Sequence, residues 1–228
     1  EILHYKDKYI TIQKYLDGSH PKKFNKALMK DLAREFSLMN KHLLKLKLKE
    51  KTLWPNDHQF KPDLKNKYNI TEIDIKEEEN TLLKQLKAIN KKNLRKSIIH
   101  SDLHDVNLLI KNNKLIAILD WDDSHEDYLS YEIAVFLVDI FAENPINKEK
   151  IKEFFKEYQK HLKLKEEEKK AVYYFIKKRF LSIIFWYSKQ RYIHKDRKQI
   201  LNQQRKAIIK GYLNFKKLTL EEFLDLCQ

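Results

Sequence analysis

Cysteine is nearly absent from this chain of 228 residues, because Cys227 is the only one. A single cysteine cannot form an intrachain disulfide or build a zinc site from cysteine ligands. No apolar run approaches the roughly 18 residues needed to cross a bilayer, and the first residues lack the basic and apolar stretches of a signal peptide. These absences exclude a disulfide scaffold and predict a cytoplasmic protein without membrane association.

Glycine is almost as rare, with only Gly18 and Gly211, and there are four prolines. Few turn-forming residues favour long helices over a β-rich fold. Hydrophobic residues make up 42% of the chain, which is enough to build a packed core despite 35% charged residues.

The net charge of +14 raises the question of a nucleic-acid partner. The lysines are spread over every expected helix and are mixed with glutamate and asparagine. This distribution is typical of solvated surfaces and argues against nucleic-acid binding. The alternative, RNA binding through the basic surface, predicts a steep salt dependence.

Apolar spacing predicts several helices. We expect them at about residues 22–48, 71–93, 147–160, 166–192 and 196–215, with Thr71 capping the second and a Thr219–Glu222 capping box starting a last one. The apolar stripes expected to be buried are Leu28, Leu32, Met39, Leu43 and Leu46 in the first helix and Leu82, Leu83, Leu86 and Ile89 in the second. The apolar run 133–138 predicts a segment buried on all sides.

Short β segments are predicted in two places. Residues 2–16 are rich in β-branched and aromatic residues around a polar turn and indicate a hairpin. Residues 98–99, 107–110 and 115–119 indicate further strands, and the Asn112–Asn113 pair favours a tight turn between the last two. Residues 54–69 are predicted to be a loop.

The chemistry is concentrated in two neighbouring stretches, HSDLHDVN at 100–107 and ILDWD at 118–122. Phosphoryl transfer needs a carboxylate that orients an attacking hydroxyl and oxygen ligands that hold Mg²⁺ against the phosphates. Asp102 and Asn107 stand at opposite ends of one loop, and the hairpin after Asn107 returns the chain so that Asp120 lies beside it. We therefore expect a base and metal ligands to converge.

These motifs resemble those of the aminoglycoside phosphotransferase superfamily, which writes them H-G-D-L-H-x-x-N and I-D-W-x-D and includes choline, homoserine and fructosamine kinases. The resemblance implies that Asp102 is the catalytic base, that Asn107 and Asp120 bind Mg²⁺, and that His100 supports the loop. Ser101 stands where glycine is usual. His104 is interpreted as a residue that packs in the loop, with a catalytic role as the alternative.

Within this superfamily the chain looks most like the homoserine kinase branch, and the resemblance covers roughly residues 1–195. That branch has an aspartate in a D-L-A helix, and Glu132 stands at its place in this chain. Residues 9–18 look like the last strand and hinge of a kinase N-lobe, where main-chain groups of Lys14 and Leu16 would bind adenine. The resemblance thus divides the chain into the end of an N-lobe with its hinge (1–18) and a helical C-lobe (19–228). The glycine-rich loop and phosphate-binding lysine of such an N-lobe are expected to lie before residue 1.

Four further charged residues are candidate substrate contacts: Asp122, Glu132, Asp139 and Arg179. Glu132 and Asp139 share a face of a buried helix, so each carboxylate needs either a protein partner or a substrate ammonium. Arg179 interrupts an apolar stripe, and its guanidinium needs a carboxylate from the protein or from a substrate.

The sequence therefore predicts an α+β, mostly helical fold, namely the C-lobe of a protein-kinase-like enzyme with the last hairpin of its N-lobe. The expected function is transfer of the ATP γ-phosphate, with Mg²⁺, to a hydroxyl of a small molecule. Homoserine-like amino alcohols are the leading candidates for the acceptor, followed by aminoglycosides and choline. The sequence does not distinguish ATP from GTP as the phosphate donor, and it does not specify an oligomeric state. A nucleotide-binding pseudokinase is the alternative from another class. A His100–Asp102–His104 metal cluster is disfavoured because no second ligand group lies nearby.

Overall fold

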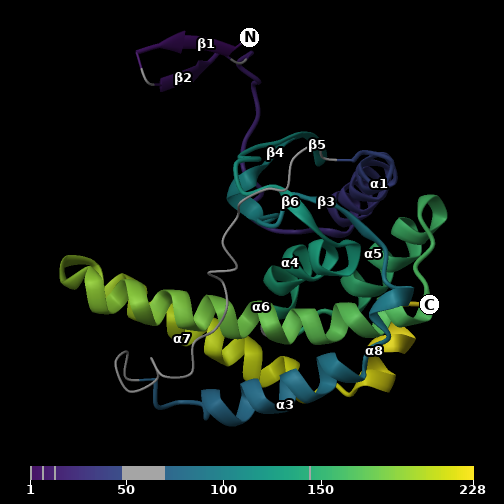
Figure 1. Ribbon diagram of the computed structural model, residues 1–228, viewed down its shortest axis with the longest axis vertical. Coiled ribbons are helices and arrows are strands. Elements are labelled where there is room, and N and C mark those ends of the chain that lie inside the picture. The colour runs from purple at the N-terminus through teal and green to yellow at the C-terminus, as the bar shows by residue number, and fades with distance from the viewer. Residues whose placement is uncertain (1, 7, 13, 48–69, 144) are drawn as a thin grey trace.

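The computed structural model describes residues 2–6, 8–12, 14–47, 70–143 and 145–228. Within these ranges the chain is mostly helical, with three two-stranded antiparallel sheets. The predicted loop at 54–69 lies outside the described residues. Figure 1 shows most of the helices below the small sheets, the first long helix beside these sheets, and the N-terminal hairpin set apart at the other end of the molecule.

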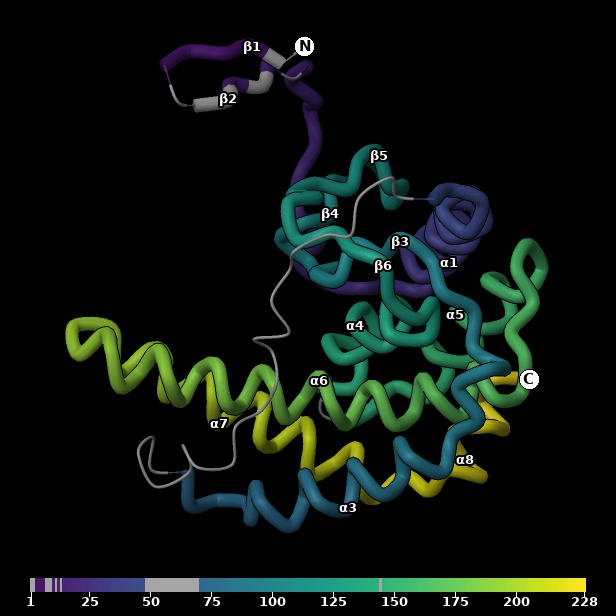
Figure 2. Tube along the Cα trace, in the orientation of Figure 1, coloured from purple at the N-terminus to yellow at the C-terminus, as the bar shows by residue number. Residues whose placement is uncertain are grey.

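The N-terminal hairpin pairs β1 (Ile2–Tyr5) with β2 (Lys8–Thr11), with Tyr5 opposite Lys8 across the turn. The predicted hairpin is confirmed, but it ends at Thr11 rather than near residue 16. Extended chain then leads to Gly18, and Ser19 forms an isolated bridge with Ile110 through two hydrogen bonds of 2.9 and 2.8 Å. Figure 2 shows that one extended segment leads from this hairpin to the helices and the other two sheets.

Helix α1 (Lys26–Leu43) begins at Asn25, whose side chain accepts a hydrogen bond from the Leu28 backbone N–H. The predicted stripe is buried at Leu28 and Leu32. Leu46 was expected to continue this stripe, and that prediction is wrong because the helix ends at Leu43 and leaves Leu46 57% exposed.

Helix α3 (Ile75–Ala88) starts later than predicted. Asp74 caps it rather than Thr71, because the Asp74 carboxylate accepts hydrogen bonds from the N–H groups of Lys76 and Glu77. The helix ends at Ala88 and a 3₁₀ turn follows at Lys91–Asn93. Leu83 is 46% exposed, so its predicted burial is wrong.

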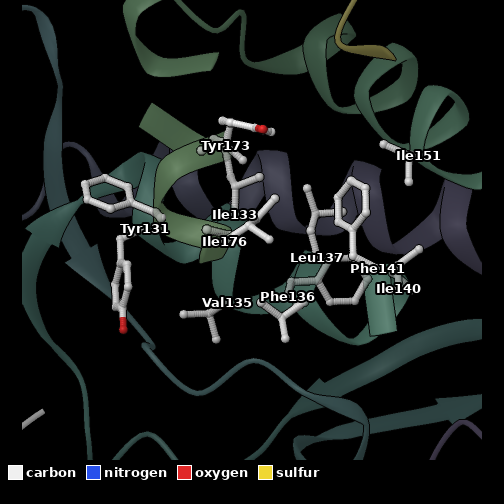
Figure 3. Close-up of a cluster of buried hydrophobic side chains, with 14 of the residues drawn as sticks. Tyr131, Ile133, Val135, Phe136, Leu137, Ile140, Phe141, Ile151, Tyr173 and Ile176 are labelled. Carbon is white, nitrogen blue, oxygen red and sulfur yellow. The ribbon is translucent and has the colours of Figure 1, made fainter. Parts of the chain in front are cut away.

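The core forms around α4 (Leu129–Ala142), which packs against the long α6 (Glu166–Ile193). Residues 133–138 of α4 are all buried, as the apolar run predicts. Figure 3 shows this cluster, in which α4 side chains such as Phe136 and Phe141 lie among residues from neighbouring helices. Burial of large aromatic side chains around α4 fixes the helix whose first turn contacts the loop at residues 100–107.

Three further helices contribute to this core: α5 (Lys148–His161), α7 (Lys198–Phe215) and α8 (Leu220–Leu226). The predicted Thr219–Glu222 capping box starts α8. No helix in the described ranges is both long and apolar enough to cross a membrane.

Two small sheets frame the loop that carries the motifs. Strand β3 (Lys96–Ile99) pairs with β6 (His125–Tyr128), and β4 (Leu108–Lys111) pairs with β5 (Lys114–Ile118). Asn112 and Asn113 adopt positive φ angles of 53° and 57°, which confirms the predicted turn. Strand β6, with the sequence HEDY, was not predicted because it carries no apolar alternation.

Gly211 allows α7 to lie against the end of α4. A Cβ atom at this position would lie 2.8 Å from Ala142 Cα and 3.2 Å from Ala142 Cβ. Backbone atoms cannot move aside by changing rotamer, so the two helices would have to separate. Alanine raises helix propensity by about 1 kcal/mol, but overpacking a core typically costs about 1–3 kcal/mol.

We therefore expect Gly211→Ala to lower the free energy of unfolding by up to about 2 kcal/mol, which is the overpacking cost less the gain in helix propensity. Urea denaturation followed by circular dichroism measures this change. Gln203→Ala, at an exposed position of the same helix, is the control and should change stability by less than about 0.5 kcal/mol. A more stable Gly211→Ala variant would contradict the close approach of α7 to α4.

Candidate active site

The loop from His100 to Asn107 leaves the end of β3 with an unusual backbone conformation. Ser101 has a φ of 67°, in the left-handed region that favours glycine. Glu132, in the first turn of α4, holds this shape by accepting hydrogen bonds from the N–H groups of His100 (2.8 Å) and Ser101 (2.9 Å). The Ser101 hydroxyl donates to the Asp123 carbonyl at 3.0 Å. Serine therefore fits where the resembling family has glycine.

Glu132 is 1% exposed, and both of its carboxylate oxygens are used by the loop. Burial raises the pKa of this carboxyl to about 7, although the two N–H groups act in the opposite direction. Of the two interpretations open from the sequence, this geometry favours the structural one. Glu132 supports the loop and does not line the cavity described below.

His100 is fully buried and links two parts of the site. Its Nδ1 accepts a hydrogen bond from the Asp102 N–H (3.3 Å), so its Nε2 carries the proton and donates to the Leu119 carbonyl (2.8 Å). The imidazole also contacts the Trp121 ring edge-on, with 4.8 Å between centroids. His100 thus ties the loop to the residue that precedes Asp120.

The structure brings Asn107 and Asp120 together. The Leu119 N–H donates to the Asn107 carbonyl at 2.8 Å, which places Asp120 next to Asn107. The Asn107 side-chain amide donates to the Asp102 carbonyl at 2.9 Å, so the Asn107 Oδ1 atom is turned away from that bond. Asp120 is exposed, has a φ of 60°, and makes no hydrogen bond or ion pair with the described residues.

These two residues fit the ligand preference of Mg²⁺, which is commonly held by one or two protein oxygens together with substrate phosphates. Within the described ranges, no group of three or more His, Cys, Asp or Glu side chains could hold a metal ion on its own. The alternative of a His100–Asp102–His104 metal cluster therefore gains no support from this part of the chain.

Asp102 is surrounded by donors. Arg179 Nη2 lies 2.7 Å from Oδ1, while His104 Nε2 and Asn107 Nδ2 lie 3.2 and 3.3 Å from Oδ2. Burial raises the pKa of the carboxyl, but the hydrogen bond from His104 and the charge of Arg179 outweigh burial and lower it to about 2. Asp102 is therefore ionised at neutral pH. The carboxylate that Arg179 requires comes from the protein.

His104 was expected mainly to pack in the loop. Its hydrogen bond with Asp102 raises its pKa, against the effect of burial, and Asp105 adds to the increase. The imidazole lies between these two carboxylates, 3.2 Å from Asp102 and 3.4 Å from Asp105. It thus contacts the carboxylate at the centre of the site rather than only packing beside it.

A cavity of about 510 Å³ opens beside Asp102. Its lining combines carboxylates, a few cations and aromatic rings: Ser101, Asp102, His104, Asp105, Asp123, His125, Asp127, Tyr131, Val135, Asp139, Lys178, Arg179, Ser182, Ile183, Trp186, Tyr187 and Ile208. Five carboxylates outnumber one lysine, one arginine and two histidines with raised pKa values, although the whole chain has a net charge of +14. The cavity is therefore an acidic region of a basic protein.

Asp139 contributes to this acidic character from the last turns of α4. Burial raises its pKa to about 6, and the nearby Asp105 carboxylate acts in the same direction. Among the described residues no lysine or arginine forms an ion pair with it within 4 Å. Tyr187 also lines the cavity, although no signal in the sequence pointed to it. Burial is the main cause that raises the pKa of Tyr187, and the nearby carboxylates of Asp139 and Asp105 raise it further.

The other predicted site residues lie elsewhere. Asp122 is exposed and does not line the cavity. Lys14 and Leu16 lie in the extended chain before Gly18, and both are exposed. No backbone hydrogen bond within the described residues occupies their main-chain groups.

The chain belongs to the phosphotransferase enzyme family, whose model matches residues 4–165. This match confirms the resemblance drawn from the motifs at 100–107 and 118–122. The narrower assignment to the homoserine kinase branch stays a prediction. No curated protein matches the sequence.

Solved structures of small-molecule kinases share the fold. A microcompartment-associated aminopropanol kinase is 14% identical with a TM-score of 0.70, and the alignment covers 99% of this chain and 74% of that one. An amicoumacin kinase in complex with AMP-PNP and Ca²⁺ is 18% identical with a TM-score of 0.63, covering 91% and 64%. A Plasmodium vivax ethanolamine kinase is 15% identical with a TM-score of 0.58, covering 93% and 66%.

The α+β kinase-like fold is therefore confirmed. The chain spans just under two thirds of the length of the amicoumacin and ethanolamine kinases.

The burial of Glu132 predicts a specific pH dependence of stability. The folded-state pKa of about 7 lies above the ordinary value of 4.5. The folded state therefore holds this proton more tightly, and the resulting stabilisation is full below pH 4.5 and lost as the pH rises through 7. Glutamine cannot titrate and loses one of the two hydrogen bonds to the loop.

We expect the free energy of unfolding of the native chain, minus that of Glu132→Gln, to fall as the pH rises from 4.5 to about 7. Urea denaturation at several pH values measures the difference. Glu126→Gln, which removes an exposed carboxyl from β6, is the control and should give a nearly constant difference. A constant difference for Glu132→Gln as well would contradict the buried position of this carboxyl.

Proposed function

We propose that this chain carries the catalytic residues of a kinase that transfers the γ-phosphate of ATP to a hydroxyl of a small molecule. One observation carries the proposal. Asp102 lies at a boundary, with the acceptor-sized cavity on one side and the Asn107–Asp120 pair on the other. Phosphoryl transfer needs this arrangement, because the acceptor hydroxyl and the metal-bound phosphate must meet at one carboxylate.

In this proposal Asp102 orients the acceptor hydroxyl and receives its proton. The acceptor oxygen forms a bond to the γ-phosphorus while the bond from that phosphorus to the β-γ bridging oxygen breaks, which leaves ADP. The low pKa of Asp102 means that the carboxylate is available as an acceptor at neutral pH. It also means that the side chain is a weak base, so that orientation of the hydroxyl contributes more than proton abstraction.

Asn107 and Asp120 would hold Mg²⁺. When bound, the metal would neutralise charge on the phosphate oxygens and fix their orientation. His100 would keep both residues in register with Asp102, because it joins the Asp102 N–H to the Leu119 carbonyl.

The nucleotide base would lie against the segment that leads from β2 to Gly18. The main-chain groups of Lys14 and Leu16, which form no backbone hydrogen bond with the described residues, support this assignment. The bridge that connects the end of this segment to β4 through Ser19 and Ile110 supports it as well. We propose the same division that the sequence predicts, with residues 1–18 as the end of an N-lobe and its hinge and residues 19–228 as the C-lobe.

The acceptor is proposed to carry an amine. Asp139 and Asp105 give one part of the cavity negative charge; among the described residues no lysine or arginine lies within 4 Å of them, and His104 lies 3.4 Å from Asp105. Trp186 and Tyr187 add aromatic rings, which bind organic cations, whereas the Tyr131 ring is already covered by Lys178 Nζ at 4.9 Å. The aminopropanol and ethanolamine kinases are named for amino alcohols. Homoserine-like amino alcohols therefore remain the leading candidates, with aminoglycosides and choline as alternatives.

The division of roles predicts different effects of two substitutions in the full-length protein. Asp102→Asn should reduce phosphorylation by at least about 100-fold while leaving MgATP affinity within a few-fold, because the base contacts the acceptor. Asp120→Asn should weaken MgATP binding itself. Calorimetry with MgATP and a coupled ADP-release assay measure the two effects, with the exposed Asp122→Asn as control. Equal loss of MgATP affinity in both variants would show that the roles are assigned wrongly.

The acidic cavity predicts a requirement for the amine. Homoserine should be phosphorylated with a kcat/KM about 10- to 100-fold higher than that of 4-hydroxybutanoate, since a charge-assisted hydrogen bond contributes about 1.5–3 kcal/mol. Asp139→Asn should remove most of this preference. The ADP-release assay with both compounds provides the test, and equal turnover of the two by the native protein would rule out recognition of the amine.

A further inference from the structure

Arg179 occupies an unusual position on α6. It lies among buried apolar residues such as Phe175, Ile176 and Phe180, and its side chain is only 17% exposed. Burying a guanidinium is unfavourable unless an anion compensates it. The nearest anion is the Asp102 carboxylate, at 2.7 Å from Nη2 to Oδ1. The position of Arg179 is therefore determined by the residue at the centre of the active site.

The two oxygens of Asp102 differ in how many donors they accept. Oδ2 receives His104 Nε2 at 3.2 Å and Asn107 Nδ2 at 3.3 Å, and a carboxylate oxygen has two lone-pair positions. Oδ1 receives Arg179 alone. Among the described residues, Oδ1 is thus the oxygen of Asp102 with acceptor capacity left.

Arg179 also lines the cavity that would hold the acceptor, and so does Asp102. Ser182, one turn further along α6 than Arg179, lines it as well. An acceptor hydroxyl that donates to Oδ1 would therefore lie beside the guanidinium. Its direction of approach would depend on the angle at which Arg179 holds the carboxylate.

We propose that Arg179 is a positioning residue for phosphoryl transfer: it holds Asp102 so that Oδ1, and not Oδ2, receives the acceptor hydroxyl. This inference rests on the proposed function. It assigns the guanidinium to the catalytic carboxylate, whereas the sequence left open whether its partner came from the protein or from a substrate. It also gives α6 a part in the chemistry, although the recognised motifs lie between residues 100 and 122.

The proposal predicts that loss of Arg179 lowers kcat without changing ligand binding. Misplacing a reacting group by about 1 Å costs on the order of 100-fold in rate. In the full-length protein, Arg179→Ala should lower kcat for homoserine by about 100-fold, while the KM for homoserine and the affinity for MgATP stay within about 3-fold. If Arg179 bound the acceptor directly, the KM would rise instead.

Chemical rescue separates positioning from a general loss of stability. Millimolar methylguanidine should enter the space left in Arg179→Ala and raise kcat several-fold, because it restores a planar donor beside Oδ1. Arg179→Lys should recover only part of the rate. Arg191→Ala removes the other arginine of α6, which donates to Asn202 at 3.1 Å outside the cavity. This control should keep its kcat and show no rescue.

The outcomes distinguish this inference from the proposed function. If the native protein releases no ADP with homoserine, 3-aminopropan-1-ol, an aminoglycoside, choline or water as acceptor, the proposed function fails and this inference fails with it. If the native protein is active and Arg179→Ala keeps its kcat, raises mainly the KM, or does not respond to methylguanidine, the positioning role is overturned while the kinase assignment stands. Circular dichroism confirms that each variant assayed is folded.

Discussion

The two hydrogen bonds that Glu132 accepts from the N–H groups of His100 and Ser101 are the constraint on which the site depends. They fix the turn after β3, and the turn fixes His100. His100 then connects the loop to the Leu119 carbonyl, and the Leu119 N–H returns to Asn107. One buried carboxylate at the start of α4 therefore determines how the loop and the β4–β5 hairpin meet. The apolar packing of α4 keeps that carboxylate in place.

The electrostatics of the site follow from this arrangement. Asp102 lies among cationic partners that keep it ionised, whereas Asp139 and Glu132 have raised pKa values because burial dominates. Carboxylates on neighbouring elements thus have opposite tendencies although they are chemically alike. The cavity thus differs in sign from the chain as a whole, because carboxylates prevail in its lining while the net charge of the chain is +14.

Local sequence signals predicted the parts of the structure that depend on local interactions. The helices, the Thr219–Glu222 capping box and the Asn112–Asn113 turn are examples. Leu46 and Leu83 were misassigned because periodicity does not reveal where a helix stops or which face finds a partner. The motifs also predicted that Asp102, Asn107 and Asp120 lie close together, because the spacing between them corresponds to one loop and one hairpin. The contact between Asp102 and Arg179 spans 77 positions along the chain, so only the packing of α6 could reveal it.

Ser101 and Asp120 both hold left-handed backbone conformations that glycine would adopt without strain. In a chain with two glycines, these turns are imposed by the surrounding fold rather than permitted by the residue itself. The backbone at Ser101 therefore has no independent preference for this shape, whereas aspartate tolerates it better at Asp120. It follows that the turn at Ser101 and the helical core form one cooperative unit, because partial melting of α4 would remove the Glu132 carboxylate that holds this turn.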